Sequence, residues 1–338
     1  MMVIGMDVHQ RYCQVALLED DSTEPKELRL NTERAELEEF AREHEGARVA
    51  FEASRNHRFV YECLEDHLEV SVANPAKTGL IGDQAVKNDR LDAKRLAVLL
   101  RADALPTSYV PPDEVRDARK LVRHRRSLVE DRTAAKNRVK AVLAERGVTY
   151  KGDVSSQQGR EFLADEELPL SAADRQVIEA DLAVIETVDE QLDDLTRELE
   201  QIAVSWEDPQ LMMTVPGIGP VIAVTIKGEV GEFERFDHKT EVVSYAGLDP
   251  AVRASGEKET TGEITKEGSS TLRWALGQGA LNAKRYDPYL GNYFTRLAEH
   301  KPKKKALVAT ARKLLVMIYA MISKQEAYDP PEGATAPS

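Results

Sequence analysis

The chain is poor in cysteine, in aromatic residues and in long apolar runs. Its only cysteines are Cys13 and Cys63, too few and too isolated for a thiolate zinc site or a disulfide framework. Aromatic residues make up 6% of the sequence. No apolar run approaches the roughly 20 residues that span a bilayer, and no signal-peptide pattern opens the chain. We therefore expect a cytoplasmic protein with no membrane partner, in which any metal is held mainly by carboxylates.

Positive charge is also scarce, because the formal net charge of the 338 residues is −13. Taken alone, a negative net charge argues against a nucleic-acid partner. Another explanation for the excess of acids is a host with a salty cytoplasm. The distribution of charge is more informative than the total. Eleven lysines and arginines face only four acids between Arg116 and Arg146, and Lys301 with Lys303 to Lys305 forms a second basic cluster. These local segments are the expected contacts to nucleic acid.

The first hundred residues alternate between strand and helix patterns. We expect strands at 2–8, 12–18, 26–31, 47–52 and 68–73, with helices after Thr32, over 57–67 and over 88–102. The order βββαβαβα is that of an α/β domain of the ribonuclease-H-like (RuvC-like) type. In that topology the first strand, the fourth strand and the last helix converge at one edge of the sheet.

Beyond the prolines at 106, 111 and 112 the pattern becomes helical. Residues 113–146 form a long basic helix and 171–205 a long acidic one, each with apolar residues three and four apart. This spacing favours a coiled-coil-like hairpin or a contact between subunits, with an ordinary helical linker as the alternative. The predicted domains are a RuvC-like domain at 1–105, a helical coiled-coil-like linker at 113–206, a mostly helical C-terminal domain at 207–326 and a disordered tail at 327–338.

Four acidic residues stand at the expected point of convergence. Asp7 and Glu52 each end an apolar run, and Asp89 and Asp92 lie three apart at a helix start, where they share a face. A lone acid at a strand end is usually a cap or turn residue, but four at matching positions favour a site for Mg²⁺ or Mn²⁺, which prefer oxygen ligands. Such ions activate and stabilise oxygens around a phosphodiester. The nearby His9 is expected to be a surface residue.

Residues 211–226 read as helix, Gly-Ile-Gly turn and helix. The pattern resembles a helix-hairpin-helix, in which backbone N–H groups near Gly217 and Gly219 hold a DNA phosphate. The alternative is that these glycines only allow two helices to pack closely.

Residues 244–273 are rich in glycine and carry Arg253, Lys266 and Arg273 around Ser255. A serine hydroxyl attacks phosphorus only if it is deprotonated and if the developing negative charge is stabilised. The cations meet the second condition, whereas the first would fall to a carboxylate or a metal-bound hydroxide because no histidine is near. From spacing alone, however, most loop serines form turns.

Several short pieces occur in one order along the chain. They are Gly5-Met6-Asp7-Val8-His9, Glu52-Ala53-Ser54, Lys87-Asn88-Asp89-Arg90-Leu91-Asp92-Ala93, Val215-Pro216-Gly217-Ile218-Gly219, Tyr245-Ala246-Gly247-Leu248, Ser255-Gly256 and Gly262-Glu263-Ile264-Thr265-Lys266-Glu267-Gly268. Each is weak alone, but together they resemble insertion-sequence transposases with an N-terminal DEDD (RuvC-like) domain and a C-terminal serine transposase domain. That family includes the Piv-type DNA invertases and recombinases guided by a bridge RNA.

The resemblance implies a transposase that cuts and rejoins double-stranded DNA through a covalent serine–DNA intermediate. Matched to the family pattern, Asp7, Glu52, Asp89 and Asp92 are the Mg²⁺-binding acids and Ser255 is the nucleophile. A structured non-coding RNA and a homo-oligomer, a dimer or tetramer, are the implied partners, with the acids of one subunit meeting the serine of another. The family often has a serine where this chain has Ala254.

Two other functions fit parts of the pattern. One is a Mg²⁺-dependent nuclease or junction resolvase that uses metal-activated water and no covalent intermediate. The other is a DNA-binding protein without enzymatic activity. An actin-like ATPase fits the sequence less well, because Asp7-Val8-His9 lacks the glycine expected in the phosphate-binding turn of such enzymes. The residues predicted to contact nucleic acid are Arg123, Arg126, Gly217, Gly219, Arg253, Lys266 and Arg273.

Overall fold

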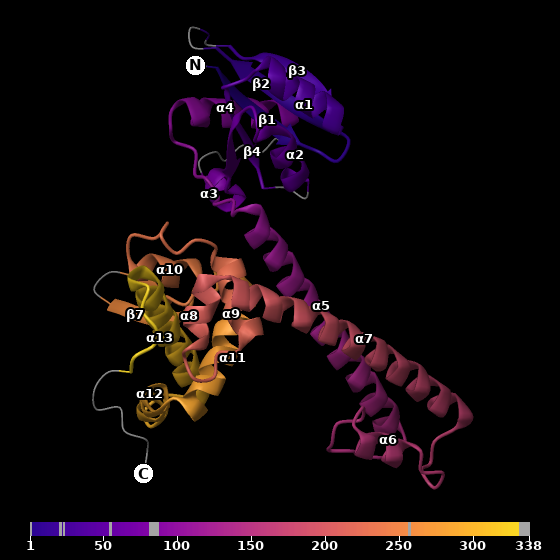
Figure 1. Cartoon of the computed structure of the whole chain (residues 1–338). Helices are drawn as coiled ribbons and strands as arrows, with labels where there is room; N and C mark the ends of the chain where they lie inside the picture. Colours follow the sequence, from indigo (N-terminus) through magenta and orange to yellow (C-terminus); the bar gives the residue numbers. More distant parts are fainter. Residues whose placement is uncertain are drawn as a thin grey trace. The chain divides into compact units, whose positions relative to one another are not determined.

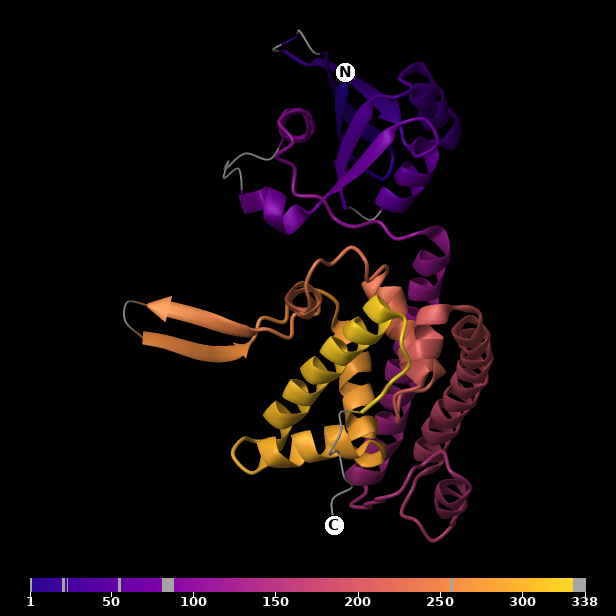
Figure 2. The same ribbon diagram turned by 60° about the vertical axis from the view of Figure 1, so that its left-hand side comes forward.

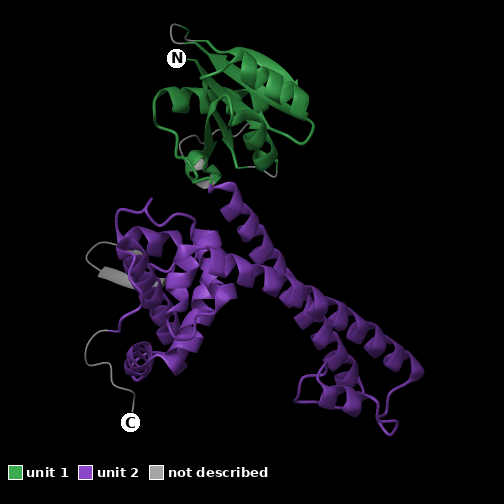
Figure 3. Ribbon diagram, viewed as in Figure 1, with its two compact units in different colours: residues 1–110 green, residues 111–338 purple. Residues whose placement is uncertain are grey.

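The computed structural model describes residues 2–19, 22, 24–53, 56–80, 88–255 and 258–330, with the backbone alone at 76, 79 and 80 and over 251–255 and 258–263. Two compact units divide the chain, Met1–Val110 and Pro111–Ser338 (Figure 3). The second unit contains both the predicted linker and the predicted C-terminal domain. The domain boundaries inside it remain predictions.

Unit 1 is built on a five-stranded sheet in the order β3-β2-β1-β4-β5. The strands are β1 Val3–Val8, β2 Tyr12–Leu18, β3 Lys26–Asn31, β4 Arg48–Glu52 and β5 Glu69–Ala73. β1 is antiparallel to β2 and parallel to β4, and β4 is parallel to β5. The five predicted strands are confirmed, and the mixed sheet is consistent with a ribonuclease-H-like DEDD domain.

Helices cover both faces of this sheet because its central strands are apolar on both sides. Ile4, Met6 and Val8 of β1 belong to the core shared with α1 and α2, whereas Val3 lies in the core shared with α4. The helices are α1 Arg34–Glu43, α2 His57–Leu64, α3 Pro75–Leu80 and α4 Asp89–Arg101 (Figure 1). The short helix α3 was not predicted, since six residues that begin with proline carry no helical period.

Unit 2 begins with a long helical hairpin. It consists of α5 Asp113–Glu145, the short α6 Gln157–Leu163 and α7 Ala172–Ser205, with α5 and α7 side by side (Figure 1). Ion pairs show that the two long helices are antiparallel, because Arg132 pairs with Asp189 and Arg146 with Asp174. Ser171 and Asp174 form a capping box that begins α7. A true coiled-coil geometry for this pair remains a prediction.

The rest of unit 2 is a helical bundle with one small sheet. Its elements are α8 Glu207–Met213, α9 Pro220–Val230, α10 Lys239–Tyr245, β6 Pro250–Ser255, β7 Lys258–Ile264, α11 Ser270–Tyr286, α12 Pro288–Ala298 and α13 Lys303–Lys324. The core joins α9, α11 and α13 around Ile226, Leu276 and Leu314. Figure 2 shows the last three helices, orange to yellow, grouped together. The antiparallel pair β6–β7 lies in a segment predicted as a loop, because its polar residues carry no apolar alternation.

Helix α13 is long and apolar enough to cross a membrane by length and composition. The core helix of a soluble protein can have the same length and composition. Leu314, Leu315 and Ile318 of α13 are fully buried in the core of unit 2. The helix is therefore explained by packing within the bundle, and it is weak evidence for a membrane contact.

Candidate active site and nucleic-acid contacts

The register of the sheet places Asp7 beside Glu52. Met6 of β1 pairs with Phe51 of the parallel strand β4, so the next residue on each strand is one of the two acids. Side chains alternate along a strand, and Asp7 therefore shares a face with Gly5 and Val3. That face packs against α4, whose residues share a core with Val3.

Gly5 allows α4 to approach the sheet closely. A Cβ atom at this position would lie 2.0 Å from the carbonyl oxygen of Ala93. Only glycine fits such a contact between a strand and a helix backbone. The close packing brings the first turn of α4, which carries Asp89 and Asp92, to the carboxyl end of β1. Asn88 caps this helix by accepting a hydrogen bond from the backbone N–H of Arg90.

His9 links the two carboxylates that this packing brings together. Its Nε2 lies 3.0 Å from Oδ2 of Asp7 and 3.1 Å from Oδ2 of Asp89. The hydroxyl of Tyr12 on β2 donates a hydrogen bond of 2.9 Å to the same oxygen of Asp89. Ligand atoms of Asp7, His9 and Asp89 all lie within 4.8 Å of one another. Two acids 82 positions apart in the sequence thus share one small site.

The pKa values of the two acids shift in opposite directions. Burial raises the pKa of Asp7, and the negative charges of Asp89 and Asp92 raise it further against the opposing effect of His9. The hydrogen bond from Tyr12 lowers the pKa of the Asp89 carboxyl. Because the charge of Asp92 contributes to the raised pKa of Asp7, these two carboxyl groups are close enough to interact electrostatically. Glu52 is exposed and lies outside the group of ligand atoms within 4.8 Å.

This arrangement fits a divalent cation. It offers carboxylate oxygens from two elements, and the mutual repulsion of Asp7, Asp89 and Asp92 is of the kind that a bound cation relieves. The sequence reasoning missed His9, expected as a surface residue, and it did not consider Tyr12. A signal was present, since Asp7 and His9 are two apart at a strand end and so point to the same side.

Ser255 is the last residue of β6, and its backbone pairs with Lys258 at the start of β7. The side chains of Ser255 and Arg253 lie outside the described residues, as does Gly256. The role predicted for Ser255 therefore rests on its sequence context.

Three of the four arginines predicted to contact nucleic acid have protein partners, and the fourth is Arg253. Arg123 donates to the carboxylate of Glu229 at 2.6 and 2.8 Å, and Arg126 pairs with Glu130 at 3.1 Å. Arg273 donates to three backbone carbonyl groups, those of Ala246, Glu267 and Gly268. Lys266 is exposed and has a positive φ of 58°.

The two glycines of the predicted helix-hairpin-helix differ from each other. Gly217 has a φ of +96°, and a Cβ there would lie 2.7 Å from the backbone nitrogen of Ala283 in α11. This glycine therefore has a packing role, as the alternative interpretation proposed. Gly219 precedes Pro220 at the start of α9, and a Cβ there would meet no atom within 4 Å. A phosphate contact at this turn remains a prediction.

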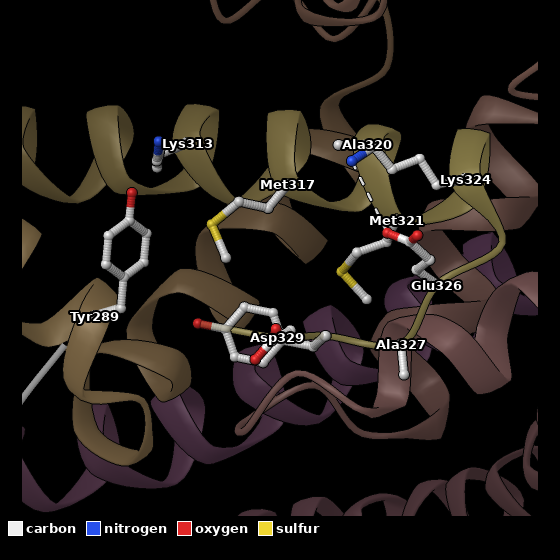
Figure 4. Close-up of a pocket in the computed structure, with 10 residues that line it drawn as sticks. Tyr289, Lys313, Met317, Ala320, Met321, Lys324, Glu326, Ala327 and Asp329 are labelled. Atoms are coloured by element: carbon white, nitrogen blue, oxygen red, sulfur yellow. Dashed lines mark ion pairs between the residues drawn. The ribbon is translucent and has the colours of Figure 1, made fainter. Parts of the chain in front are cut away.

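A hollow of about 200 Å³ in unit 2 lies away from all these residues. Residues 326–329 cross beside α13 there, near Met317 and Met321, and Lys324 pairs with Glu326 (Figure 4). The hydroxyl of Tyr328, within the predicted tail, donates to Asp287 at 2.8 Å. The hollow contains none of the predicted catalytic groups, so we assign no chemistry to it.

Comparison with known proteins identifies the class of enzyme. A DEDD-type transposase model of the IS110 group matches residues 4–146, and the model described as "Transposase IS116/IS110/IS902 family" matches residues 209–295. A transposase for insertion sequence element IS1111A from Coxiella burnetii is 28% identical over 72% of this chain and 68% of its own length. A Pseudomonas aeruginosa protein described as "Probable family 20 transposase" is 26% identical over 97% of this chain and 98% of its own length.

The chain is thus a transposase, a DNA recombinase that acts in DNA transposition. It belongs to the IS110/IS116 family of transposases, with a DEDD domain at its N-terminus.

Proposed function

We propose that this transposase cuts and rejoins the DNA of an insertion sequence by divalent-metal chemistry at Asp7, Glu52, Asp89 and Asp92, through a covalent intermediate on Ser255. The observation that carries the metal site is the meeting of Asp7 and Asp89 at one sheet edge, 3.0 and 3.1 Å from His9. Bound there, Mg²⁺ or Mn²⁺ would stabilise negative charge on the scissile phosphodiester. The clustered acids are the feature that a purely DNA-binding protein does not require.

The acids have distinct positions in this site. Asp7 and Asp89 would provide the central ligands, and Glu52 of β4 and Asp92 of the first turn of α4 would extend the set. Tyr12 fixes the orientation of Asp89 through its hydrogen bond, and His9 lies between the two carboxylates. Hydrogen bonds of this type commonly orient metal ligands in proteins.

Ser255 acts as the nucleophile in the covalent step. Its Oγ forms a bond to phosphorus while the bond from phosphorus to one DNA oxygen breaks. The serine proton passes to a carboxylate, and the released DNA oxygen takes up a proton. Rejoining reverses the step with a hydroxyl of another strand. The family resemblance supports this role, with Ser255 supplied by one subunit of a homo-oligomer to the acids of another.

A structured non-coding RNA of the element is proposed to select the DNA partners by base pairing. The support for it is the family resemblance alone. Strand exchange that requires this RNA, and that changes target when its pairing segments are changed, is the expected result. Equal exchange without RNA would exclude a guiding role.

The test is a strand-exchange assay in Mg²⁺ with purified protein. Asp7→Asn and Asp89→Asn should abolish exchange and leave DNA binding intact, and Ser255→Ala should abolish both exchange and covalent adducts. Asp103→Asn is the control, because this exposed acid contacts Arg48 on the surface of unit 1. Unchanged DNA cleavage by Ser255→Ala would favour the nuclease alternative. Full activity of Asp7→Asn would refute the metal site.

A further inference from the structure

The last three helices carry a positive charge that the whole chain does not. Residues 269–325 contain eleven lysines and arginines and only two acids, in a protein of net charge −13. One of those acids, Asp287, is 2% exposed and caps the start of α12. The C-terminal helices therefore form one of two basic segments in unit 2.

The other basic segment is largely neutralised within the protein. Seven of the eleven cations between Arg116 and Arg146 have a carboxylate within 4.0 Å, including Arg132 with Asp189 and Arg138 with Asp181. In the described part of residues 269–325, the corresponding number is two of eleven, Arg312 and Lys324. Helix α5 is thus basic in sequence, but α13 is the helix whose charge is available to a ligand.

A groove concentrates this available charge between α10, α12 and α13. It has a volume of about 270 Å³, and its polar lining comes from the side chains of Lys239, Thr240, Tyr293, Arg312 and Lys313. Val243, Ala309 and Val316 complete the wall. No acid is among the described residues that line it, although Arg312 contacts Asp249 nearby at 3.2 Å.

The basic character continues along α13 beyond the groove. Lys305, Ala309, Arg312 and Val316 are spaced by four, three and four residues, so they share one face of the helix. Lys305 is exposed and lies two turns, about 10 Å, before Arg312 along the helix axis. A strand lying along this face would meet several cations in succession.

We infer that this surface, the α13 groove together with Lys305, binds the phosphodiester backbone of double-stranded DNA. Proteins contact DNA phosphates with the cationic groups of lysine and arginine and with side-chain hydroxyl groups. Such contacts position the protein on the duplex and do not distinguish one base sequence from another. Double-stranded DNA is the ligand because the chain is a DNA transposase. The inference deepens the proposed function by giving that DNA a surface separate from the acids and from Ser255.

The experiment uses the full chain and end-labelled duplex DNA of the element, titrated by fluorescence anisotropy between about 50 and 200 mM salt. The groove variant is Lys239→Gln with Lys305→Gln and Lys313→Gln. Its affinity for the duplex should fall. The plot of log K against log salt should also become shallower, by about 0.9 in slope for each phosphate that the variant no longer neutralises. Replacement of the same three lysines by arginine should restore wild-type binding, which separates a charge effect from misfolding.

Lys120→Gln with Lys140→Gln and Lys151→Gln removes the same charge from α5 and the residues that follow it. This control should bind duplex DNA with the wild-type salt slope. Wild-type affinity and slope in the groove variant would overturn the inference, as would a loss confined to structured RNA. The titrations contain no divalent metal, so a failed metal site would leave this result unaffected.

Discussion

Arg123 on α5 donates two hydrogen bonds to the carboxylate of Glu229 on α9, at 2.6 and 2.8 Å. The Glu229 side chain is 1% exposed. The hydroxyl of Tyr245 also donates to the backbone carbonyl of Glu229 at 3.1 Å. A buried carboxylate requires such partners, because the transfer of a charge out of water is costly. The pair therefore fixes the long helix α5 to the helical bundle of unit 2.

Arg123→Ala should destabilise the protein by about 2–3 kcal/mol, because it leaves the Glu229 charge buried without its ion-pair partner. Chemical denaturation measures the change. Arg197→Ala is the matched control, since Arg197 pairs with the exposed Asp194 and should contribute less than about 1 kcal/mol. Equal effects of the two substitutions would contradict a structural role for Arg123. Adding Glu229→Gln to Arg123→Ala should recover part of the loss.

Gly5→Ala should push α4 away from β1, since its Cβ would lie 2.0 Å from the carbonyl oxygen of Ala93. We expect a loss of about 1–3 kcal/mol in stability and weaker Mn²⁺ binding. Thermal unfolding and calorimetric titration with Mn²⁺ measure the two effects. Gly277→Ala in α11 faces open space and should be tolerated or slightly stabilising. Unchanged Mn²⁺ binding in Gly5→Ala would show that the α4 contact does not position the acids.

Acid should weaken the far end of the α5–α7 hairpin. A hydrogen bond from Lys136 lowers the pKa of Asp153 to about 2, and one from Arg146 lowers that of Asp174 to about 2. Both values lie below the ordinary value of 3.8, so this stability is complete above pH 3.8 and is lost as the pH falls through about 2. The double variant Asp153→Asn with Asp174→Asn should show a smaller change in melting temperature than the wild type between pH 3.8 and about 2. An identical pH profile would contradict the assignment.

Tyr328→Phe should detach the C-terminal segment from α12, because it removes the hydrogen bond from the tyrosine hydroxyl to Asp287. The expected loss is about 1 kcal/mol at neutral pH, measured by thermal unfolding. Burial and Asp287 raise the pKa of Tyr328, so its contribution is complete below the ordinary value of 10 and is lost as the pH rises above it. The wild type should therefore approach the variant in alkali. A constant difference at all pH values would argue against this bond.

The sequence was a good guide to unit 1 because its signals are local and periodic. The apolar run of β1 indicated the strand and placed Asp7 near its end, and the helical pattern over 88–102 indicated where α4 begins. The convergence of Asp7 with Asp89 followed from topology. The contact of His9 with Asp89 did not, since it depends on the orientation of one side chain in the turn between β1 and β2.

Unit 2 shows why the number of unpaired cations in the basic segment around α5 could not be predicted from the sequence. Charge can be counted in a sequence, but the pairing of Arg132 with Asp189 or of Arg123 with Glu229 joins residues more than 50 positions apart. Such long-range pairs decide which cations remain available. The β6–β7 hairpin was missed for a different reason, because β7 is rich in Lys, Glu and Thr and lacks the apolar alternation that marks a strand.

The most direct test of a joint role for the acids and Ser255 is the metal dependence of the covalent protein–DNA adduct. End-labelled DNA is incubated with the protein and any required RNA, with and without Mg²⁺, and the adduct is quantified after denaturation. The wild type should form an adduct only with Mg²⁺, and Asp7→Asn and Ser255→Ala should form none. An adduct on the wild type without divalent metal, or on Asp7→Asn at the wild-type level, would contradict the account.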